Sequence, residues 1–312
     1  MAINNIICVV GPTASGKTAL AVELAKAFDG EVVSFDSMQI YRRMDIGTAK
    51  PTAEEMQGIP HHMIDIIEPD EAFSVGRFVE LADPILRDIL SRGKRVILAG
   101  GTGLYVDALI RGGDFAPTPS TGCREALEAR AEAEGIEVLM EELRAIDPEA
   151  LERSQGNPRR IIRALEVFQE TGETITAHDL RTRSVPPKYT PLWIGLDFES
   201  RQELYDRIDL RVELMVKAGL LEEIREILGS GIPESATAMQ AIGYKEFVGA
   251  MAGRDTLENA IAQVQQSSRR YAKRQLTWFR KNPNIHWICR KTGQSSDEIF
   301  ETARQTVLQF DN

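Results

Sequence analysis

The chain has 312 residues, of which 43% are hydrophobic and 27% charged, a composition typical of a globular protein with one large domain or two ordinary ones. It contains no run of about 18 apolar residues and no N-terminal secretory signal, so we expect a cytoplasmic protein without membrane spans. Three widely spaced cysteines argue against a disulfide framework, and a net charge of −10 argues against a nucleic-acid partner unless basic residues are clustered.

Strand and helix patterns alternate along the first part of the chain. We expect strands at 6–10, 31–35 and 95–99, and helices at 17–28 and 75–92. Such alternation predicts a doubly wound parallel sheet, in which ligands bind at the C-terminal ends of the strands.

The pattern changes between two segments rich in Gly, Pro, Ser and Thr. Residues 123–180 show helical patterns only, a strand pattern returns at 192–198, and helical patterns follow to the C-terminus. The sequence therefore predicts an α/β fold: a core formed by 1–115 and 190–312, interrupted by an all-helical insertion at 116–189.

The segment "GPTASGKT" (11–18) fits the phosphate-loop pattern, with Gly11, Gly16, Lys17 and Thr18 at the required positions. The glycines let backbone amides turn toward anionic oxygens, Lys17 adds a positive charge, and Thr18 can reach a metal ion. A triphosphatase would also need an acidic residue after the 95–99 strand, and none stands there. This weakens the ATPase interpretation and leaves a kinase, or an enzyme that binds another phosphate.

Two further segments lie at predicted strand ends. Asp36 follows the second strand and is either a general base or metal ligand, or the N-cap of a helix. In "GGTGLY" (100–105), the glycines around Thr102 indicate either a close backbone approach to a ligand or a tight turn. A zinc site at His61–His62 is not expected, because adjacent strand residues point to opposite faces.

Basic residues occur in three patterns. Arg207 and Arg211 share a helix face and either clamp a diphosphate or form an ion-pair ladder with Asp206 and Asp209. The segment 267–281 holds six basic residues and no acidic one. Its core stripe would be Ala272, Leu276 and Phe279, and the basic residues with Tyr271 and Trp278 form either an RNA-binding surface or a solvated cationic face. A third cluster, Arg159, Arg160 and Arg163, lies at a helix start, where positive charge opposes the helix dipole.

Nine segments, taken in order, resemble one family. They are "GPTASGKT", "DSMQIY", "DIGTAKP", "HHMID", "GGTGLY", "NPRRIIRALEVF", "YDRIDLRV", "AIGYKE" and "YAKRQLTWFRK". Together they are similar to the motif set of the bacterial tRNA dimethylallyltransferases, also called tRNA isopentenyltransferases, over nearly the whole chain. One departure is Gly156-Asn157-Pro158, where the family often has Asn-Asp, which leaves open which side chain caps the following helix.

The resemblance implies a kinase-like P-loop core with a helical insertion. It implies transfer of a dimethylallyl group from dimethylallyl diphosphate to N6 of the adenosine 3′ to a tRNA anticodon, with Mg²⁺ as cofactor. The expected partners are the tRNA anticodon stem-loop and dimethylallyl diphosphate, with no membrane and no obligate protein partner, so the chain is expected to be a monomer.

The resemblance also implies the site. Asp36 would accept the N6 proton, Thr102 would lie beside the adenine and the diphosphate, and Lys17 and Arg211 complete the catalytic set. The diphosphate would be bound by Gly11, Pro12, Thr13, Ala14, Ser15, Gly16, Lys17, Thr18 and Arg207, and Thr18 would also reach Mg²⁺. The tRNA would be contacted by Asp36, Ser37, Met38, Gln39, Thr102, Arg124, Arg159, Arg160, Ile161, Ile162, Arg163, Gln240, Ala241, Ile242, Gly243, Tyr244, Lys245, Arg270, Lys273 and Arg274.

Three other functions compete with this one. A nucleoside or small-molecule kinase on the same core would bind ATP, and an adenylate isopentenyltransferase would prenylate AMP or ATP, but neither needs two basic segments. A non-enzymatic RNA-binding module would not need Lys17, Asp36 or Thr102.

Overall fold

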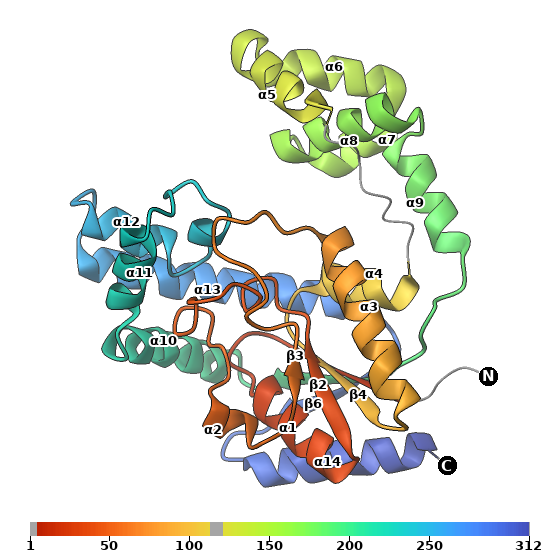
Figure 1. The fold of residues 1–312 in the computed structure, drawn as a ribbon, viewed down its shortest axis with the longest axis vertical. Helices are drawn as coiled ribbons and strands as arrows, with labels where there is room; N and C mark the ends of the chain where they lie inside the picture. Colours follow the sequence, from red (N-terminus) through yellow and green to blue (C-terminus); the bar gives the residue numbers. More distant parts are fainter. Residues whose placement is uncertain (1–4, 113–120, 312) are drawn as a thin grey trace. The chain divides into compact units, whose positions relative to one another are not determined.

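The computed structural model describes residues 5–112 and 121–311 (Figure 1). Its six strands form one parallel sheet in the order β3-β2-β4-β1-β5-β6. The strands are β1 (Ile6–Val10), β2 (Gly30–Ser34), β3 (His61–His62), β4 (Arg95–Ala99), β5 (Leu192–Phe198) and β6 (Ile285–Arg290). The predicted α/β fold with a parallel sheet is confirmed.

Helices cover both faces of the sheet. Ile6, Cys8 and Val10 of β1 face α3 (Val75–Ser91) and α4 (Gly103–Arg111), whereas Ile7 and Val9 face α1 (Lys17–Ala27) and α14 (Ser296–Asp311). Because successive strand residues point to opposite faces, a strand buried on both sides is mostly apolar, and "IICVV" is apolar throughout.

β6 escaped the sequence prediction, and β3 was assumed to be a strand at His61–His62 but was not counted among the strands of the sheet. β3 is only two residues long and consists of histidines, and β6, "IHWICR", lies at the sheet edge with alternating burial. The expectation of helices alone after 198 was therefore wrong. Short or edge strands bury little apolar surface, so their sequences carry a weak signal.

The core unit has further helices besides the four that cover the sheet. They are α2 (Ala53–Met56), α10 (Arg201–Lys217), α11 (Leu220–Gly229), α12 (Lys245–Met251) and α13 (Leu257–Phe279), with a 3₁₀ turn at Ala238–Gln240. Ile40, Tyr41 and Met44, which follow β2, are fully buried among apolar side chains of α11, α12 and α13. This packing anchors the segment that runs from the end of β2 to β3.

The chain divides into two compact units, Met1–Ile110 with Tyr189–Asn312, and Arg111–Lys188. The second contains α5 (Cys123–Glu134), α6 (Ile136–Ile146), α7 (Pro148–Ser154), α8 (Pro158–Thr171) and α9 (Ile175–Ser184), around a core of its own. The expected boundary between 115 and 116 falls outside the described residues. At the start of α8, the Asn157 side chain accepts from the N–H groups of Arg159 and Arg160, so Asn157 is the cap.

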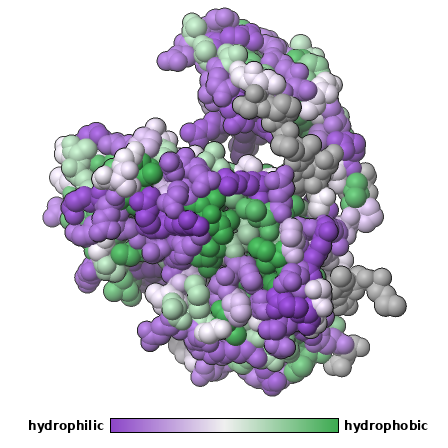
Figure 2. All heavy atoms as spheres, viewed as in Figure 1, coloured by the Kyte–Doolittle hydropathy of each residue, from purple (hydrophilic) through white to green (hydrophobic). Residues whose placement is uncertain are grey.

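None of the helices in the described parts of the chain is long and apolar enough to span a bilayer. Hydrophilic side chains cover most of the face of each unit drawn in Figure 2.

Candidate active site

The phosphate loop connects β1 to α1 and turns its backbone inward. Gly11 has φ +144°, and a Cβ there would lie 2.6 Å from the Leu196 carbonyl oxygen, so no other residue fits. Ala14 and Gly16 have φ of 63° and 90°. Gly16 is the N-cap of α1 and supplies no side-chain cap, so the first amides of the helix are left for an anion.

Polar side chains of the loop are arranged for an anionic ligand. The Lys17 ammonium donates to the Pro12 carbonyl at 2.6 Å. Loss of solvation and the positive charge of Arg211 lower the pKa of Lys17 to about 7, although the negative charge of Asp36 acts to raise it. An anion bound in the loop would raise this pKa again and restore the charge of Lys17. The buried Ser15 hydroxyl has no hydrogen-bond partner among the described residues. Such an orphaned buried group fits a site that is completed by a ligand.

Two arginines of α10 reach this loop. Arg211 donates to the Thr13 hydroxyl, and Arg207 donates to the Ala14 carbonyl at 3.1 Å. Within the described residues neither forms an ion pair: Asp209 pairs instead with Arg269 at 2.6 Å, and Asp206 accepts from Gln202. The ion-pair ladder considered for this helix is therefore absent from those ranges, and both arginines lie at the phosphate loop.

Gln275 of α13 is a site residue that the sequence did not reveal. Its buried amide accepts from the Thr13 N–H at 2.8 Å and donates to the Gly101 carbonyl at 3.1 Å. One side chain thus ties the phosphate loop to the segment after β4. A glutamine within a basic amphipathic helix gives no sequence signal for such a contact, which spans 262 positions.

Asp36 lies opposite the loop, at the end of β2. It begins a turn rather than a helix: its carboxylate accepts from the Met38 N–H at 2.9 Å, so the helix-cap alternative was wrong. Thr102 accepts from the Ser37 N–H at 3.1 Å, which brings the segments after β2 and β4 together. Gln39 bonds to Ser34 and to the carbonyls of Thr48 and Ala49.

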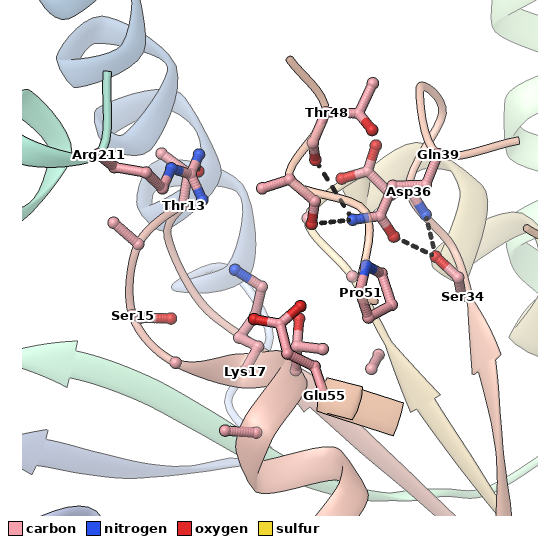
Figure 3. A pocket seen from close by; sticks show the side chains of 18 of the residues that line it. Thr13, Ser15, Lys17, Ser34, Asp36, Gln39, Thr48, Pro51, Glu55 and Arg211 are labelled. Carbon is pink, nitrogen blue, oxygen red and sulfur yellow. Dashed lines mark hydrogen bonds between the residues drawn. The ribbon is translucent and has the colours of Figure 1, made fainter. Parts of the chain in front are cut away.

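Asp36, Gln39 and residues 13–18 of the phosphate loop line one cavity of about 480 Å³ (Figure 3). Thr102 is not among its lining residues and accepts a hydrogen bond from the Ser37 N–H. Lys17 and Arg211 line it from the phosphate-loop side, and Asp36 and Gln39 from the other. Tyr271 of α13 also lines it, and burial together with the Asp36 charge raises the pKa of its phenol to about 12, so the hydroxyl stays protonated. Apolar lining comes from Val32, Ile64, Pro51, Leu210 and Leu214.

The glycines of "GGTGLY" also have close neighbours within the protein, and Gly100 and Gly101 line the cavity, so a close backbone approach to a ligand stays a prediction. None has a positive φ, so a tight turn does not explain them. A Cβ would lie 2.7 Å from Phe35 at Gly100, 2.0 Å from Gln275 at Gly101 and 2.2 Å from Trp278 at Gly103. The close neighbours are protein side chains, and the glycines let α13 and Phe35 approach the segment that carries Thr102.

Gly101→Ala is therefore expected to destabilise the protein by about 1–3 kcal/mol, because the buried Gln275 amide has no solvent to move into. It should also weaken binding of a diphosphate ligand, since displaced Gln275 releases Thr13. Thermal unfolding and ligand titration check both effects. Gly249→Ala is the control: its Cβ meets nothing within 4 Å, so a gain of up to about 1 kcal/mol is expected in helix α12. Equal stability of the two variants would contradict this account.

The outer face of α13 is cationic. The predicted core stripe of Ala272, Leu276 and Phe279 is buried, and Arg270, Lys273 and Arg274 are exposed. The Arg274 guanidinium lies over the Tyr271 ring at 5.6 Å, and the Lys281 ammonium over the Trp278 ring at 5.7 Å. The Trp278 indole donates to Asp107 at 2.9 Å, so this tryptophan is also held by the core.

Some residues expected at the tRNA interface have buried side chains. Ile161 and Ile162 are buried in the core of the insertion, and Tyr244 is buried in the core unit. Contacts of these three residues with tRNA stay a prediction, and their side chains pack in the apolar cores of their units. Arg124 and Arg163 both pair with Glu166 at 2.8 Å, whereas Arg159 and Arg160 are exposed.

The described residues contain no group of three or more His, Cys, Asp or Glu side chains that could hold a metal ion alone. His61 and His62 bond to the Ile59 carbonyl and to Glu31. Thr18 and Asp36 line the cavity as oxygen donors. Mg²⁺ is commonly held by one or two protein oxygens together with phosphate oxygens, so these residues fit it if a diphosphate shares the site.

The same chain matches known proteins over most of its length. A family model described as IPP transferase matches residues 39–282, which leaves the phosphate loop outside the match. A tRNA dimethylallyltransferase of Acetivibrio thermocellus is 44% identical over 310 residues, or 99% of each chain, and one of a Thermoanaerobacter species is 49% identical over 286 residues, or 91% of each.

Solved structures agree with these relatives. The tRNA isopentenylpyrophosphate transferase of Bacillus halodurans has a TM-score of 0.73 and 42% identity, covering 99% of this chain and 98% of that one. A eukaryotic dimethylallyltransferase acting on tRNA has a TM-score of 0.81 and 26% identity, covering 98% of this chain and 80% of that one. The chain therefore belongs to the IPP transferase family, that of the tRNA dimethylallyltransferases.

Proposed function

We propose that the chain transfers a dimethylallyl group from dimethylallyl diphosphate to N6 of the adenosine 3′ to the anticodon of tRNAs and releases diphosphate. One observation carries this proposal beyond the family's name: a cationic, amide-lined phosphate loop and a carboxylate, Asp36, face each other across one cavity. An electrophile held by its diphosphate and a base for the incoming amine need this arrangement.

The phosphate loop acts on the leaving group. Negative charge grows on the bridging oxygen as the allylic carbon–oxygen bond breaks, and fixed positive groups stabilise it most when water is excluded. Lys17, Arg211 and the amides at the start of α1 supply such groups. The Ser15 hydroxyl supplies one more donor with no competing partner in the described parts of the chain.

Asp36 acts on the acceptor. An exocyclic adenine amine is a weak nucleophile, so a positioned carboxylate that takes its proton assists the attack. The Met38 N–H fixes one carboxylate oxygen at 2.9 Å and leaves the other for the substrate. Thr102 holds the Ser37 amide beside it. The target base must leave its stack to reach this cavity.

Mg²⁺ is the proposed cofactor, with Thr18 as a ligand. When bound, it would neutralise part of the diphosphate charge. Thr18 stands at the second position of α1, where its hydroxyl lines the cavity.

The exposed basic residues of α13 and of the start of α8 are the proposed tRNA contacts, through backbone phosphates and base stacking. Exposure of Arg270 and Lys273, with no ion pair in the described ranges, supports this role. Prenylation of free AMP remains the competing function, and it would leave this surface unused.

Label transfer separates the two functions. The protein is incubated with Mg²⁺, dimethylallyl diphosphate labelled in the prenyl group, and either tRNA or AMP. Label in tRNA at an adenosine beside the anticodon is the expected result. Label in AMP but not in tRNA would sink the proposal.

A further inference from the structure

Three consecutive backbone N–H groups converge on one carboxylate, that of Glu223 on α11. Its Oε2 accepts from Asp45 and Ile46 at 2.8 and 2.7 Å, and its Oε1 accepts from Gly47 at 3.2 Å. Successive backbone amides of this kind form a nest that binds an anion. Here the anion is the Glu223 carboxylate, which lies 176–178 positions away in the sequence. The segment 45–47 is thereby held to α11.

Tyr244 closes the same arrangement. Its hydroxyl donates to Glu223 Oε1 at 2.6 Å. Burial and the Glu223 charge raise the pKa of this phenol, so it remains a donor. Its ring also occupies the space beside Gly47, where a Cβ would lie 2.4 Å from ring carbon Cε2. Tyr244 belongs to the segment 240–245, for which the family resemblance implies contact with tRNA.

The chain runs from Gly47 directly into the wall of the cavity. Thr48 and Ala49 line it, and their carbonyls accept from the Gln39 amide at 3.3 and 3.1 Å. Gln39 in turn accepts from the Ser34 hydroxyl at 3.1 Å, which accepts from the Asp36 N–H at 3.3 Å (Figure 3). Hydrogen bonds and a short backbone segment therefore connect Glu223 to the backbone of the proposed base.

We propose that Glu223 is a positioning residue for the transfer reaction: it fixes the 45–49 segment, which sets Gln39 and, through Ser34, the turn that carries Asp36. This inference rests on the proposed function. In this proposal Tyr244 connects the 240–245 segment to the cavity wall, because its hydroxyl donates to Glu223. Within the described parts of the chain, none of the hydrogen bonds of this network goes to residues 11–18, so we place its effect on the acceptor side of the cavity and not on the diphosphate.

Glu223→Gln tests the proposal, because an amide accepts at one end only and turns its N–H₂ toward backbone donors. We expect kcat to fall about tenfold or more, with the KM for dimethylallyl diphosphate within about threefold of the wild type. Glu226→Gln, an exposed neighbour on α11, is the matched control and should change neither. Unchanged kcat in Glu223→Gln, or a fall in kcat matched by a large rise in donor KM, would overturn the positioning role.

A double-mutant cycle distinguishes positioning from general stabilisation. In a Gln39→Ala background, Glu223→Gln should change kcat by less than about twofold, because the path is already cut. If the kcat loss of the double variant equalled the product of the losses in the two single variants, the proposal would be contradicted. If Glu223→Gln does not fold, Tyr244→Phe replaces it in the double-mutant cycle. We expect Tyr244→Phe to lower kcat by about threefold, because it removes one hydrogen bond and keeps the ring.

Labelling of tRNA by the wild type shows whether a negative result concerns the role of Glu223 or the proposed function on which that role rests. A wild-type chain that fails to label tRNA contradicts the proposed function. An active wild type with unchanged Glu223→Gln and Tyr244→Phe variants contradicts the role of Glu223 alone.

Discussion

Asp36→Asn is expected to lower kcat by about 10²–10⁴-fold while the affinity for tRNA changes little, because the amide cannot accept the N6 proton. The substitution is conservative in structure. Asparagine keeps the oxygen that accepts from the Met38 N–H at 2.9 Å, so the turn should persist. Single-turnover transfer of the prenyl label gives the chemical rate, and filter binding gives the tRNA affinity.

Asp70→Asn is the control for Asp36→Asn. Asp70 is an exposed carboxylate in a turn, so its loss should leave both measurements unchanged. Near-normal turnover in Asp36→Asn would remove Asp36 from the role of base. A loss of tRNA binding equal to the loss of rate would show that it binds the substrate instead.

Arg211→Gln is expected to lower kcat/KM for dimethylallyl diphosphate by about 10²–10³-fold, because a guanidinium beside the leaving group stabilises developing charge. Burial lowers the pKa of Arg211, and no carboxylate forms an ion pair with it in the described ranges. A cation placed in this way costs stability in the ligand-free protein. The variant should therefore unfold at the same temperature as the wild type or higher, which separates lost catalysis from lost folding.

Arg225→Gln is the matched control for Arg211→Gln. Arg225 lies on α11 with its side chain 63% exposed, where it pairs with Glu222 at 3.4 Å, so neither rate nor stability should change appreciably. An Arg211→Gln variant with near-normal kcat/KM would place the diphosphate elsewhere in the cavity.

Local features of the fold could be predicted from the sequence. The strands at 6–10, 95–99 and 192–198 were located because each is an apolar run between turn residues, and the phosphate loop because its pattern is contiguous. β6 was missed and β3 was not placed in the sheet, because these strands are short or half-exposed and their pairing depends on neighbours far away in sequence.

The same limit applies to the site. Lys17, Asp36 and Arg211 stand within recognisable motifs, and the structure brings all three to one cavity. Gln275 and Glu223 gave no signal, because their functions lie in contacts across 262 and up to 178 positions. The glycines of "GGTGLY" were recognised as unusual, but only the packing of Gln275 and Trp278 shows why they are small.

In the proposed reaction the phosphate loop binds the group that leaves and not the group that is transferred. The direct test uses dimethylallyl diphosphate labelled with ¹⁴C in the prenyl chain and ³²P in the diphosphate, incubated with the protein, Mg²⁺ and tRNA. We expect ¹⁴C in the tRNA, an equal molar amount of ³²P released as free diphosphate, and no ³²P in the tRNA. Appearance of ³²P in the tRNA, or of ¹⁴C in free alcohol only, would contradict it.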